Sequence, residues 1–472
     1  MFVNARDLPE IALAPAATGT GKSYMACNIA AHKYLSGVID AVAIIAPMGV
    51  HRQWIEEVLP RDMTLAVKTR SLIWKPSLEL RKKRMTHCGS DNMLPVLAFN
   101  VEAFSADSGR AAKALAEYCR AHRVLLILDE STSVKTPRAI RTKTLIKLAP
   151  LAACRMILTG TPITRGIEDL WAQYEFLNPS IIGMSNYFAF RGRYCVVAPA
   201  YRGAGVGVVK IVGYRNMEEF LRKIAPVTFS IPKDVLGLPS KVYEEIAVEL
   251  TDEQRRAYNA LRKKLVDDLK AQEIVSPANA AVRIVRLQQV LSGRILVRDS
   301  DDPEAPTEVR SIPSRRIAAL MSTIENNPDN YVIWGRFTAD LLEIEQALKK
   351  MGRKPALYYG DMSDEDRANR KKDFLNGHAT DFVAQPAIAG LGLDGLQRVA
   401  DRMVFYSHGF NRLHRWQGED RLHRMGTTGT VVVLDMVAGP GVTVDRMALD
   451  SYKKTEDLIR TFMNNPDLLP EV

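Results

Sequence analysis

The amino-acid sequence predicts an α/β protein with two similar lobes, each a parallel sheet flanked by helices, and a helical insertion between the lobes. The first observation is a series of short, continuous apolar runs, which are typical of strands buried on both faces of a parallel sheet. The second is that stretches of helical spacing separate these runs, as in repeated strand–helix units. Functional residues of such sheets gather where the carboxyl ends of the strands meet.

The first lobe is predicted from the first half of the chain. We expect its strands at residues 11–16, 41–47, 95–100, 124–130 and 155–162. Helices are expected between them at 23–35 and 109–122. The second lobe repeats this order, with a helix at 339–351 and strands at 331–337, 356–361, 382–387, 402–407 and 430–437.

A charge-rich stretch separates the two series of strands. Residues 251–295 have a helical pattern, and the acidic, Pro-containing residues 298–308 are the best linker candidate. The 472 residues allow several domains at roughly one per 100 to 200 residues. We therefore predict a first lobe over 1–235, a helical insertion and linker over 236–310, and a second lobe over 311–472.

Composition excludes several classes of protein. Hydrophobic residues make up 47% and charged residues 25% of the chain, close to soluble globular averages. No apolar run approaches the roughly 18 residues of a membrane span, and the first ten residues lack the order of a signal peptide. Five cysteines without a C-x-x-C pair argue against a disulfide framework and a zinc site. We expect an intracellular protein with reduced thiols.

The charge is distributed unevenly. Residues 1–230 hold 30 basic and 18 acidic residues, a net +12, whereas residues 231–472 hold 34 and 36, a net −2. This asymmetry suggests a polyanionic partner, although basic composition alone is a weak indicator.

The segment AATGTGKS, residues 16–23, follows the first predicted strand and opens a helix. A phosphate-binding loop needs small residues whose amides approach the phosphates, a Lys for the β- and γ-phosphates, and a hydroxyl for Mg²⁺. Ala16 replaces the first Gly of the usual pattern, and a Gly-rich turn that caps a helix is the alternative. The residues expected to bind the nucleotide are Thr18, Gly19, Thr20, Gly21, Lys22 and Ser23.

Two adjacent carboxylates, Asp129 and Glu130, end the fourth predicted strand. In a nucleotide hydrolase, the first would hold Mg²⁺ together with Ser23, and the second would accept a proton from the attacking water. A helix cap or a solvated sheet edge is the alternative for an isolated Asp-Glu pair. The phosphate loop earlier in the chain favours the catalytic interpretation.

Two further patterns have simple structural alternatives. Thr159 and Thr161 follow the fifth predicted strand, where a helix N-cap would explain them equally well. Residues 417–426 are predicted to be helical, so that the i, i+3 spacing would place Arg421 and Arg424 on one face. Two guanidinium groups aimed together suit a phosphoryl group, and a solvated basic helix is the alternative.

Residues 131–167 and 176–217 contain no acidic residue. The second stretch also carries Tyr187, Phe188, Phe190 and Tyr194 among its arginines. Basic surface interleaved with aromatic rings predicts a nucleic-acid track, with solvated faces over core aromatics as the alternative. The residues of the first stretch expected to contact nucleic acid are Lys135, Arg138, Arg141 and Lys143.

Several segments of the chain, taken in order, resemble the motif series of the superfamily-two helicase fold, and specifically of its Swi/Snf-type branch of DNA translocases. These segments are AATGTGKS, IIAPMGVHRQW, LAFNVEAF, LDEST, LTGTP, VIWGRF, GLGLDGLQRVADRMVFY and QGEDRLHRMG. The resemblance extends from about Ile11 to about Val437. The last segment is the most specific, because Q-x-x-D-R-x-H-R-x-G distinguishes the Swi/Snf branch from most strand-separating relatives. The chain looks most like the compact versions found in bacteriophages and prophages.

This resemblance implies two RecA-like lobes that bind ATP and Mg²⁺ and act on DNA. It implies that Glu130 is the catalytic base, that Arg421 and Arg424 serve in catalysis, and that Gln417 binds the nucleotide. Thr159 and Thr161 would couple the nucleotide state to DNA, and the segment from Gly390 to Asp394 would contact the DNA backbone. Two departures are LDEST in place of D-E-A-H or D-E-G-H, and Asp394 where an Asn is common.

The sequence therefore predicts a DNA-dependent ATPase that tracks along duplex DNA without necessarily separating strands. A strand-separating or annealing helicase at forks is one alternative, and a nucleic-acid-binding regulatory protein with weak ATPase activity is another. We expect the protein in the cytoplasm of a bacterium or phage-infected cell, or in the nucleus if it is eukaryotic.

Overall fold

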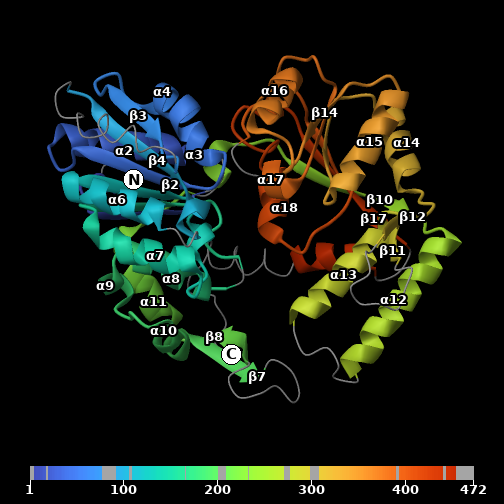
Figure 1. Cartoon of the computed structure of the whole chain (residues 1–472), viewed down its shortest axis with the longest axis horizontal. Helices are drawn as coiled ribbons and strands as arrows, with labels where there is room; N and C mark the ends of the chain where they lie inside the picture. The colour runs from blue at the N-terminus through green and yellow to red at the C-terminus, as the bar shows by residue number, and fades with distance from the viewer. Residues whose placement is uncertain are drawn as a thin grey trace. The chain divides into compact units, whose positions relative to one another are not determined.

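The structure is a computed structural model that divides the chain into two compact units (Figure 1). Unit 1 comprises the described residues up to Gly237, and unit 2 comprises those from Leu238 onward. The structure describes residues 5–16, 20–76, 92–105, 109–164, 166–199, 209–231, 233–270, 277–297, 308–389, 393–439 and 443–452.

Unit 1 is built on a seven-stranded sheet in the order β3-β4-β2-β5-β6-β1-β9, in which all neighbouring strands are parallel. Five of these strands coincide with the predicted apolar runs. The other two, β3 and β9, are short and only half-buried, so their sequences lack a continuous apolar run. The strands are β1 (Glu10–Ala16), β2 (Ala41–Ala46), β3 (Thr69–Ile73), β4 (Leu94–Asn100), β5 (Val124–Asp129), β6 (Cys154–Leu158) and β9 (Thr228–Ile231).

Helices cover both faces of the first sheet. Successive side chains of a strand point to opposite faces, so each buried strand contributes to a core on both sides. In β2, Ala43 and Ile45 join the core beneath α6, α7 and α8, whereas Val42 and Ile44 line a small apolar pocket beneath α2 and η1. The helical segments are α2 (Lys22–Leu35), α3 (Val50–Gln53), the π-helix η1 (Trp54–Val58), α4 (Leu59–Asp62), η3 (Val101–Ser105), α6 (Arg110–Ala121), η4 (Ser131–Val134), α7 (Ile140–Leu148), η5 (Ala149–Leu151), α8 (Glu168–Leu177), α9 (Pro179–Ile182), α10 (Tyr187–Tyr194), α11 (Met217–Ile224), η6 (Ala225–Val227) and η7 (Lys233–Leu236). A two-stranded antiparallel ribbon joins β7 (Cys195–Pro199) and β8 (Val209–Tyr214).

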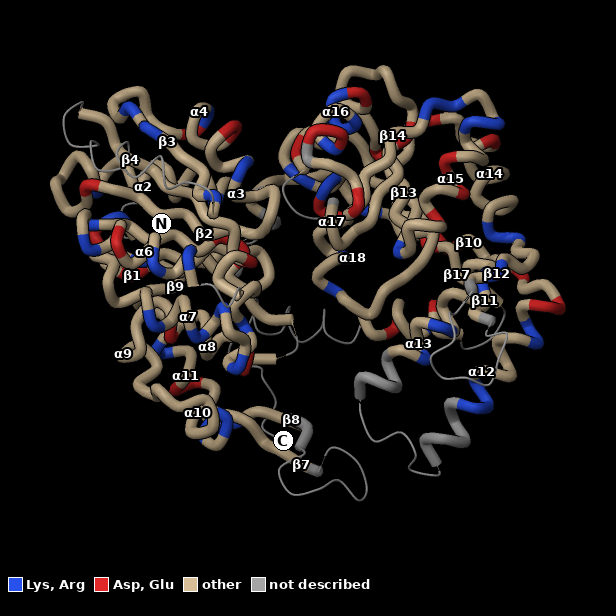
Figure 2. Tube along the Cα trace, viewed as in Figure 1, with Lys and Arg blue, Asp and Glu red and all other residues tan. Residues whose placement is uncertain are grey.

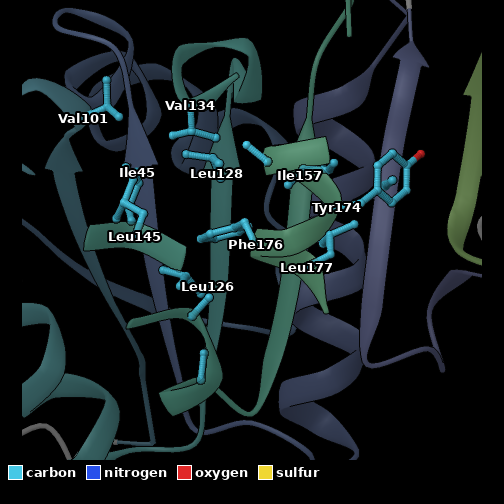
Figure 3. Packing of buried hydrophobic residues seen from close by; sticks show 14 of the residues in the cluster. Ile45, Val101, Leu126, Leu128, Val134, Leu145, Ile157, Tyr174, Phe176 and Leu177 are labelled. Carbon is cyan, nitrogen blue, oxygen red and sulfur yellow. The ribbon is translucent and has the colours of Figure 1, made fainter. Parts of the chain in front are cut away.

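The core on the first of these faces holds β5 in place (Figure 3). Leu126 and Leu128 of β5 belong to one buried cluster with Leu145 of α7 and Phe176 of α8. Burying each such side chain contributes about 1.5 to 3 kcal/mol to stability. The carboxyl end of β5, where Asp129 lies, is therefore part of a rigid framework.

Unit 2 is built on a six-stranded parallel sheet in the order β10-β17-β16-β13-β15-β14. One face packs against α14 and α15, and the other packs against α16 and the segment around Leu393 and Leu422. The strands are β10 (Lys241–Val248), β13 (Tyr331–Trp334), β14 (Pro355–Tyr358), β15 (Asp381–Ala384), β16 (Arg402–Phe405) and β17 (Val431–Ala438). The helices of the two faces and their connections are α14 (Arg316–Asn326), α15 (Thr338–Lys350), α16 (Asp364–Leu375), α17 (Pro386–Ala389), η8 (Leu396–Arg398) and α18 (Arg412–Glu419).

The fold-class prediction is confirmed, since each unit is a parallel sheet flanked by helices. The predicted helical stretch at 251–295 contains α12 (Asp252–Lys270) and α13 (Pro277–Leu291), followed by a ribbon of β11 (Arg294–Val297) and β12 (Glu308–Ser311). Most of the predicted linker, residues 298–307, lies outside the described residues.

One strand differs from the expected course of the chain. β10 lies inside the stretch predicted as helical insertion and linker, yet it pairs with β17 along its whole length. Its edge position leaves most of its side chains partly or fully exposed, including Glu244 and Glu245, so its sequence lacks the apolar run of a central strand. The three-part division by residue number therefore stays a prediction.

No helix of the described residues is long and apolar enough to cross a membrane. Four cysteines, Cys27, Cys119, Cys154 and Cys195, are buried free thiols, and Cys88 lies outside the described residues.

Candidate functional site

The predicted phosphate loop connects β1 to α2. Gly21 immediately precedes the helix with a φ of 82°, a left-handed conformation that glycine adopts without steric cost. Lys22 and Ser23 are the first two residues of α2, and both are half-buried. The amides at the start of this 14-residue helix would face an anion, as helix N-termini do. Thr18 and Gly19 lie outside the described residues, and Thr20 is the first described residue after them.

Asp129 ends β5 and is 7% exposed. Its Oδ2 atom accepts a 2.7 Å hydrogen bond from the indole Nε1 of Trp54, and its Oδ1 atom accepts one of 2.9 Å from the amide of Glu130. Glu130 itself has φ 48° and ψ 57°, a left-handed conformation that is uncommon for a residue with a side chain. Such strained residues cluster at active sites, where the surrounding structure holds them.

The electrostatics bring Lys22 and Asp129 into one site, although they follow different strands. Burial raises the pKa of Asp129, and the Trp54 hydrogen bond, the charge of Lys22 and the Glu130 amide only partly offset it. A divalent cation beside the carboxylate would lower the pKa of Asp129, as the charge of Lys22 does.

The oxygens present fit a magnesium ion. An ionised carboxylate has about four lone-pair sites, and the hydrogen bonds that Asp129 accepts from Trp54 and Glu130 use one on each oxygen. Mg²⁺ is usually held by one or two carboxylates plus substrate phosphates and water, without an all-protein cage. The described residues contain no group of three or more His, Cys, Asp or Glu side chains that could hold a metal.

A hydrogen-bond chain joins the loop after β5 to the loop after β6. Ser131 donates a 2.6 Å bond to Oε1 of Gln173, whose amide nitrogen donates 2.8 Å to the carbonyl of Pro162. Thr159 is fully buried, and its hydroxyl accepts a 3.1 Å bond from the amide of Thr161. Thr159 and Thr161 thus shape a loop that is physically linked to the Asp129–Glu130 turn.

Sequence reasoning missed Trp54 and Gln173. Trp54 lies 75 residues from Asp129, and Gln173 lies 42 residues from Ser131. Trp54 stood within a segment that carried the family resemblance, which was the only available signal. Gln173 is an isolated amide side chain on the buried helix α8, and no pattern marked it.

The predicted nucleic-acid residues lie in different environments on unit 1. Arg138 is exposed, and its guanidinium carbon lies 5.6 Å from the centroid of the Phe188 ring. The guanidinium of Arg191 lies 5.3 Å from the same ring, which is 53% exposed. Lys143 is exposed and Arg141 is half-buried, both on α7, whose basic residues are marked in Figure 2. Lys135 donates a 2.5 Å hydrogen bond to the hydroxyl of Thr164.

Arg421 and Arg424 lie together in unit 2, but the predicted reason was wrong. Helix α18 ends at Glu419, so both arginines lie in the turns that follow it. In these turns, the hydroxyl of Thr427 lies 2.5 and 2.6 Å from the carbonyl oxygens of Leu422 and Arg424. We call residues 420–427 the arginine loop.

The two guanidinium groups converge on one carbonyl oxygen. Nη1 of Arg421 donates a 2.5 Å bond to the carbonyl of Leu393, and Nη1 of Arg424 donates one of 3.3 Å to the same atom. Arg424 also lies 3.5 Å from the carboxylate of Asp394, so the unusual acid at this position pairs with an arginine. Gln417 is buried, and its carbonyl accepts a 3.1 Å bond from Nε of Arg421. Residues 390–392 lie outside the described residues.

A buried ionic network fixes the end of α18. The carboxylate of Glu419 accepts 2.7 Å bonds from Lys241 and Tyr243 of β10 and from Nε of Arg415. Arg415 also bonds both carboxylate oxygens of Asp435 on β17. Burial alone would raise the pKa of Glu419, but the charges of Arg415 and Lys241 outweigh it and lower the pKa to about 2. Sequence reasoning did not single out this network.

Comparison with known proteins places these residues in a family. The chain is 22% identical over 469 residues to Protein CHROMATIN REMODELING 24 of Arabidopsis thaliana, covering 90% of this chain and 42% of that protein, so it spans less than half of that relative. It is 24% identical over 472 residues to a protein of Acyrthosiphon pisum secondary endosymbiont phage 1, covering 94% of this chain and 93% of the phage protein. The Sulfolobus solfataricus SWI2/SNF2 ATPase core in complex with dsDNA aligns at 18% identity and a TM-score of 0.39, covering 99% of this chain and 89% of that one. Residues 18–294, more than half of the chain, match the SNF2-related domain, and the chain therefore belongs to this family.

Proposed function

We propose that this protein is a DNA-dependent ATPase that uses ATP and Mg²⁺ to translocate along double-stranded DNA. The observation that carries the proposal is the end of β5: a buried Asp129 under the charge of Lys22, followed by a strained Glu130. Membership of the SNF2-related domain family supports ATP hydrolysis. The Sulfolobus core is in complex with dsDNA, and we propose duplex DNA as the partner of this chain as well.

Four residues of unit 1 have proposed roles in hydrolysis. Lys22 would bind the β- and γ-phosphates, while Ser23 and Asp129 would hold Mg²⁺, which when bound neutralises phosphate charge. Glu130 would accept the proton of the attacking water. Its left-handed backbone turns the chain sharply after Asp129, so the two carboxylates need not share one role.

Arg421 and Arg424 would stabilise the negative charge that develops on the transferring phosphoryl group. Their shared bond to the Leu393 carbonyl keeps the two positive groups together despite their mutual repulsion. Gln417, whose backbone carbonyl accepts a bond from Arg421, would bind the nucleotide.

Basic residues of the first acid-free stretch would supply DNA affinity. Within the described part of the chain, none of Arg138, Arg141 and Lys143 pairs with a carboxylate, so their charges are available to phosphates. Thr159 and Thr161 would relay the nucleotide state through the loop that Gln173 joins to the Asp129–Glu130 turn.

One observation favours a second candidate function, a strand-separating helicase at forks. The ring of Phe188 is 53% exposed, and the guanidinium carbons of Arg138 and Arg191 lie 5.6 and 5.3 Å from its centroid. An exposed ring beside two cations suits stacking against an unpaired base, which duplex DNA does not offer.

Steady-state ATPase rates test the proposal directly. The pure protein is measured alone and with duplex DNA, single-stranded DNA, forked DNA and RNA. We expect the largest stimulation by duplex DNA, and no turnover in Lys22→Ala, whereas Lys113→Ala on the exposed face of α6 should behave like wild type. Stimulation by forks or single strands alone would favour the second candidate, and DNA binding without turnover would indicate a regulatory protein.

A further inference from the structure

We propose that the segment through which the chain enters unit 2 positions the arginine loop for catalysis, with Lys241, Tyr243 and His423 as positioning residues. The entry segment is residues 238–243, directly after the boundary between the units. The inference rests on the proposed function, because it assigns a purpose to contacts around Arg421 and Arg424.

Side chains of β10 contact Glu419, the residue directly before the arginine loop. Nζ of Lys241 and the hydroxyl of Tyr243 both donate 2.7 Å bonds to Oε2 of Glu419. Lys241 and Tyr243 lie two positions apart on the strand and thus on the same face. Glu419 is the last residue of α18, so these bonds fix the point from which the loop departs.

The backbone transmits this constraint into the loop. The carbonyl of Glu419 accepts bonds from the amides of Leu422 and His423, at 3.2 and 3.0 Å. A displacement of Glu419 would therefore displace the residues that lie between Arg421 and Arg424.

His423 provides a second, independent contact with the entry segment. Its Nε2 atom lies 2.8 Å from the carbonyl oxygen of Pro239. A carbonyl only accepts hydrogen bonds, so Nε2 carries the hydrogen in this contact. The side chain of His423 is flanked in sequence by Leu422 and Arg424, which places this contact inside the arginine loop itself.

The entry segment is in turn fixed to the sheet. The carbonyl of Ser240 accepts a 3.1 Å bond from the amide of Val431, and Lys241 pairs with Val431 at the start of the β10–β17 ladder. Arg415 holds the other oxygen of Glu419 and reaches Asp435 on β17. The arginine loop is therefore clamped between two adjacent strands, and one of them is the first strand after the boundary.

A buried ion pair is often no more stabilising than apolar residues of the same volume, so we assign this network to positioning. Catalysis by Arg421 and Arg424 requires that their guanidinium groups stay in place, because a misplacement of about 1 Å can cost about 100-fold in rate.

The test compares Tyr243→Phe, Lys241→Met and the double variant with Lys349→Met, which removes an exposed ion pair with Glu345 elsewhere in unit 2. Tyr243→Phe removes one hydroxyl and keeps the ring, so it should fold even if Lys241→Met does not. We expect the double variant to lose about 10-fold or more in kcat at saturating duplex DNA, with ATP affinity within about two-fold of wild type. Lys241→Arg should restore part of the rate, and Lys349→Met should behave like wild type.

A second measurement does not depend on ATP hydrolysis. Trypsin cleaves after arginine, so loosening of the loop should accelerate cleavage after Arg421 or Arg424, identified by mass spectrometry, while other sites of unit 2 stay protected. Unchanged kcat together with unchanged cleavage in Tyr243→Phe would overturn the proposal. Cleavage accelerated throughout unit 2 would overturn it as well, since it would indicate a general structural role. If the wild-type protein hydrolyses no ATP, the proposed function fails, and the cleavage pattern still decides whether the entry segment holds the loop.

Discussion

Trp54 donates a 2.7 Å hydrogen bond from its indole nitrogen to Oδ2 of Asp129, and both side chains are buried. Trp54 begins the π-helix η1, a one-turn interruption between α3 and α4. Such π-turns inside helices are frequent at functional sites. The interruption places a neutral donor against the carboxylate that we propose as a magnesium ligand.

Trp54→Phe should therefore weaken both the magnesium site and the fold. The ring is retained while the donor to Asp129 is lost, so the carboxylate can rotate from its present orientation. We expect the Mg²⁺ concentration for half-maximal ATPase activity to rise several-fold. The free energy of unfolding should fall by about 1.5 to 3 kcal/mol, the value of a hydrogen bond to a charged group, as measured by urea denaturation.

Trp171→Phe is the matched control for this prediction. Trp171 also donates a 2.8 Å bond in unit 1, but to the carbonyl of Met184. A smaller loss of stability, about 0.5 to 1.5 kcal/mol for a bond to a neutral carbonyl, is expected with an unchanged Mg²⁺ requirement. An equal shift of the Mg²⁺ requirement in both variants would contradict the assigned role of Trp54.

Arg421→Ala and Arg424→Ala should separate nucleotide binding from chemistry. Since these residues would stabilise charge that appears mainly in the transition state, each loss should lower kcat by about 10³-fold or more with ATP affinity nearly unchanged. The measurements are a fluorescence titration with nucleotide and the ATPase rate at saturating duplex DNA. Turnover within a few-fold of wild type would show that the arginines are structural, and a parallel loss of binding and thermal stability would indicate misfolding.

Replacing Arg138, Arg141 and Lys143 with Ala should weaken binding to all DNA sequences alike. Each phosphate contact contributes nearly one unit to the slope of log K against log salt, so the slope should become shallower by up to about three units. Fluorescence anisotropy at several salt concentrations measures this slope. Arg222→Ala is the control, because Arg222 is exposed in unit 1 and pairs with Glu218. An unchanged slope in the triple variant would identify this surface as merely solvated.

Glu175→Gln should stabilise the protein at alkaline pH and not at acidic pH. Burial raises the pKa of Glu175 to about 7, and its Oε2 atom is buried without a hydrogen-bond partner among the described residues. Because the folded pKa is raised, wild-type stability falls as pH rises from about 4.5 to about 7 and stays lower above that.

The variant lacks this ionisation, so it should be more stable than wild type by up to about 3 kcal/mol at pH 8, with little difference at pH 4.5. Thermal unfolding at both pH values measures the difference. Glu117→Gln on the exposed face of α6 is the control and should show no such divergence. A gain of the same size at both pH values would exclude ionisation as its cause.

The central strands could be predicted from the sequence because burial on both faces demands a continuous apolar run, as in β5. Three of the four edge strands, β3, β9 and β10, could not, because exposure permits polar residues: β10 carries Glu244 and Glu245, and β3 begins with Thr69 and Arg70. The fourth, β14, was predicted because it is mostly buried. Local sequence pattern therefore indicates how deeply a strand is buried more reliably than whether a strand exists.

The site was predictable only where one segment contains all of its chemistry. Lys22 and Ser23 adjoin a glycine turn, and Asp129 and Glu130 end a strand, so each pair was visible in sequence. Contacts between distant segments were not, including the bond of Trp54 to Asp129. For Arg421 and Arg424 the expected proximity was right but the helix was wrong, since Thr427 and the Leu393 carbonyl create the arrangement.

The pairing of β10 with β17 also constrains how the chain folds as it is synthesised. In unit 1, the last of the seven strands of the sheet ends at Ile231. In unit 2, the hydroxyls of Ser240 and Thr430, which directly precede β10 and β17, lie 3.5 Å apart although the two residues are 190 positions apart in the sequence. Closing so long a loop carries an entropic cost, and the ribosome must release the last strand before the first can pair. During that interval both edges of β10 are unpaired, and an unpaired strand edge can pair with strands of other chains. The nascent second unit therefore keeps its first strand unpaired until its last strand has been synthesised.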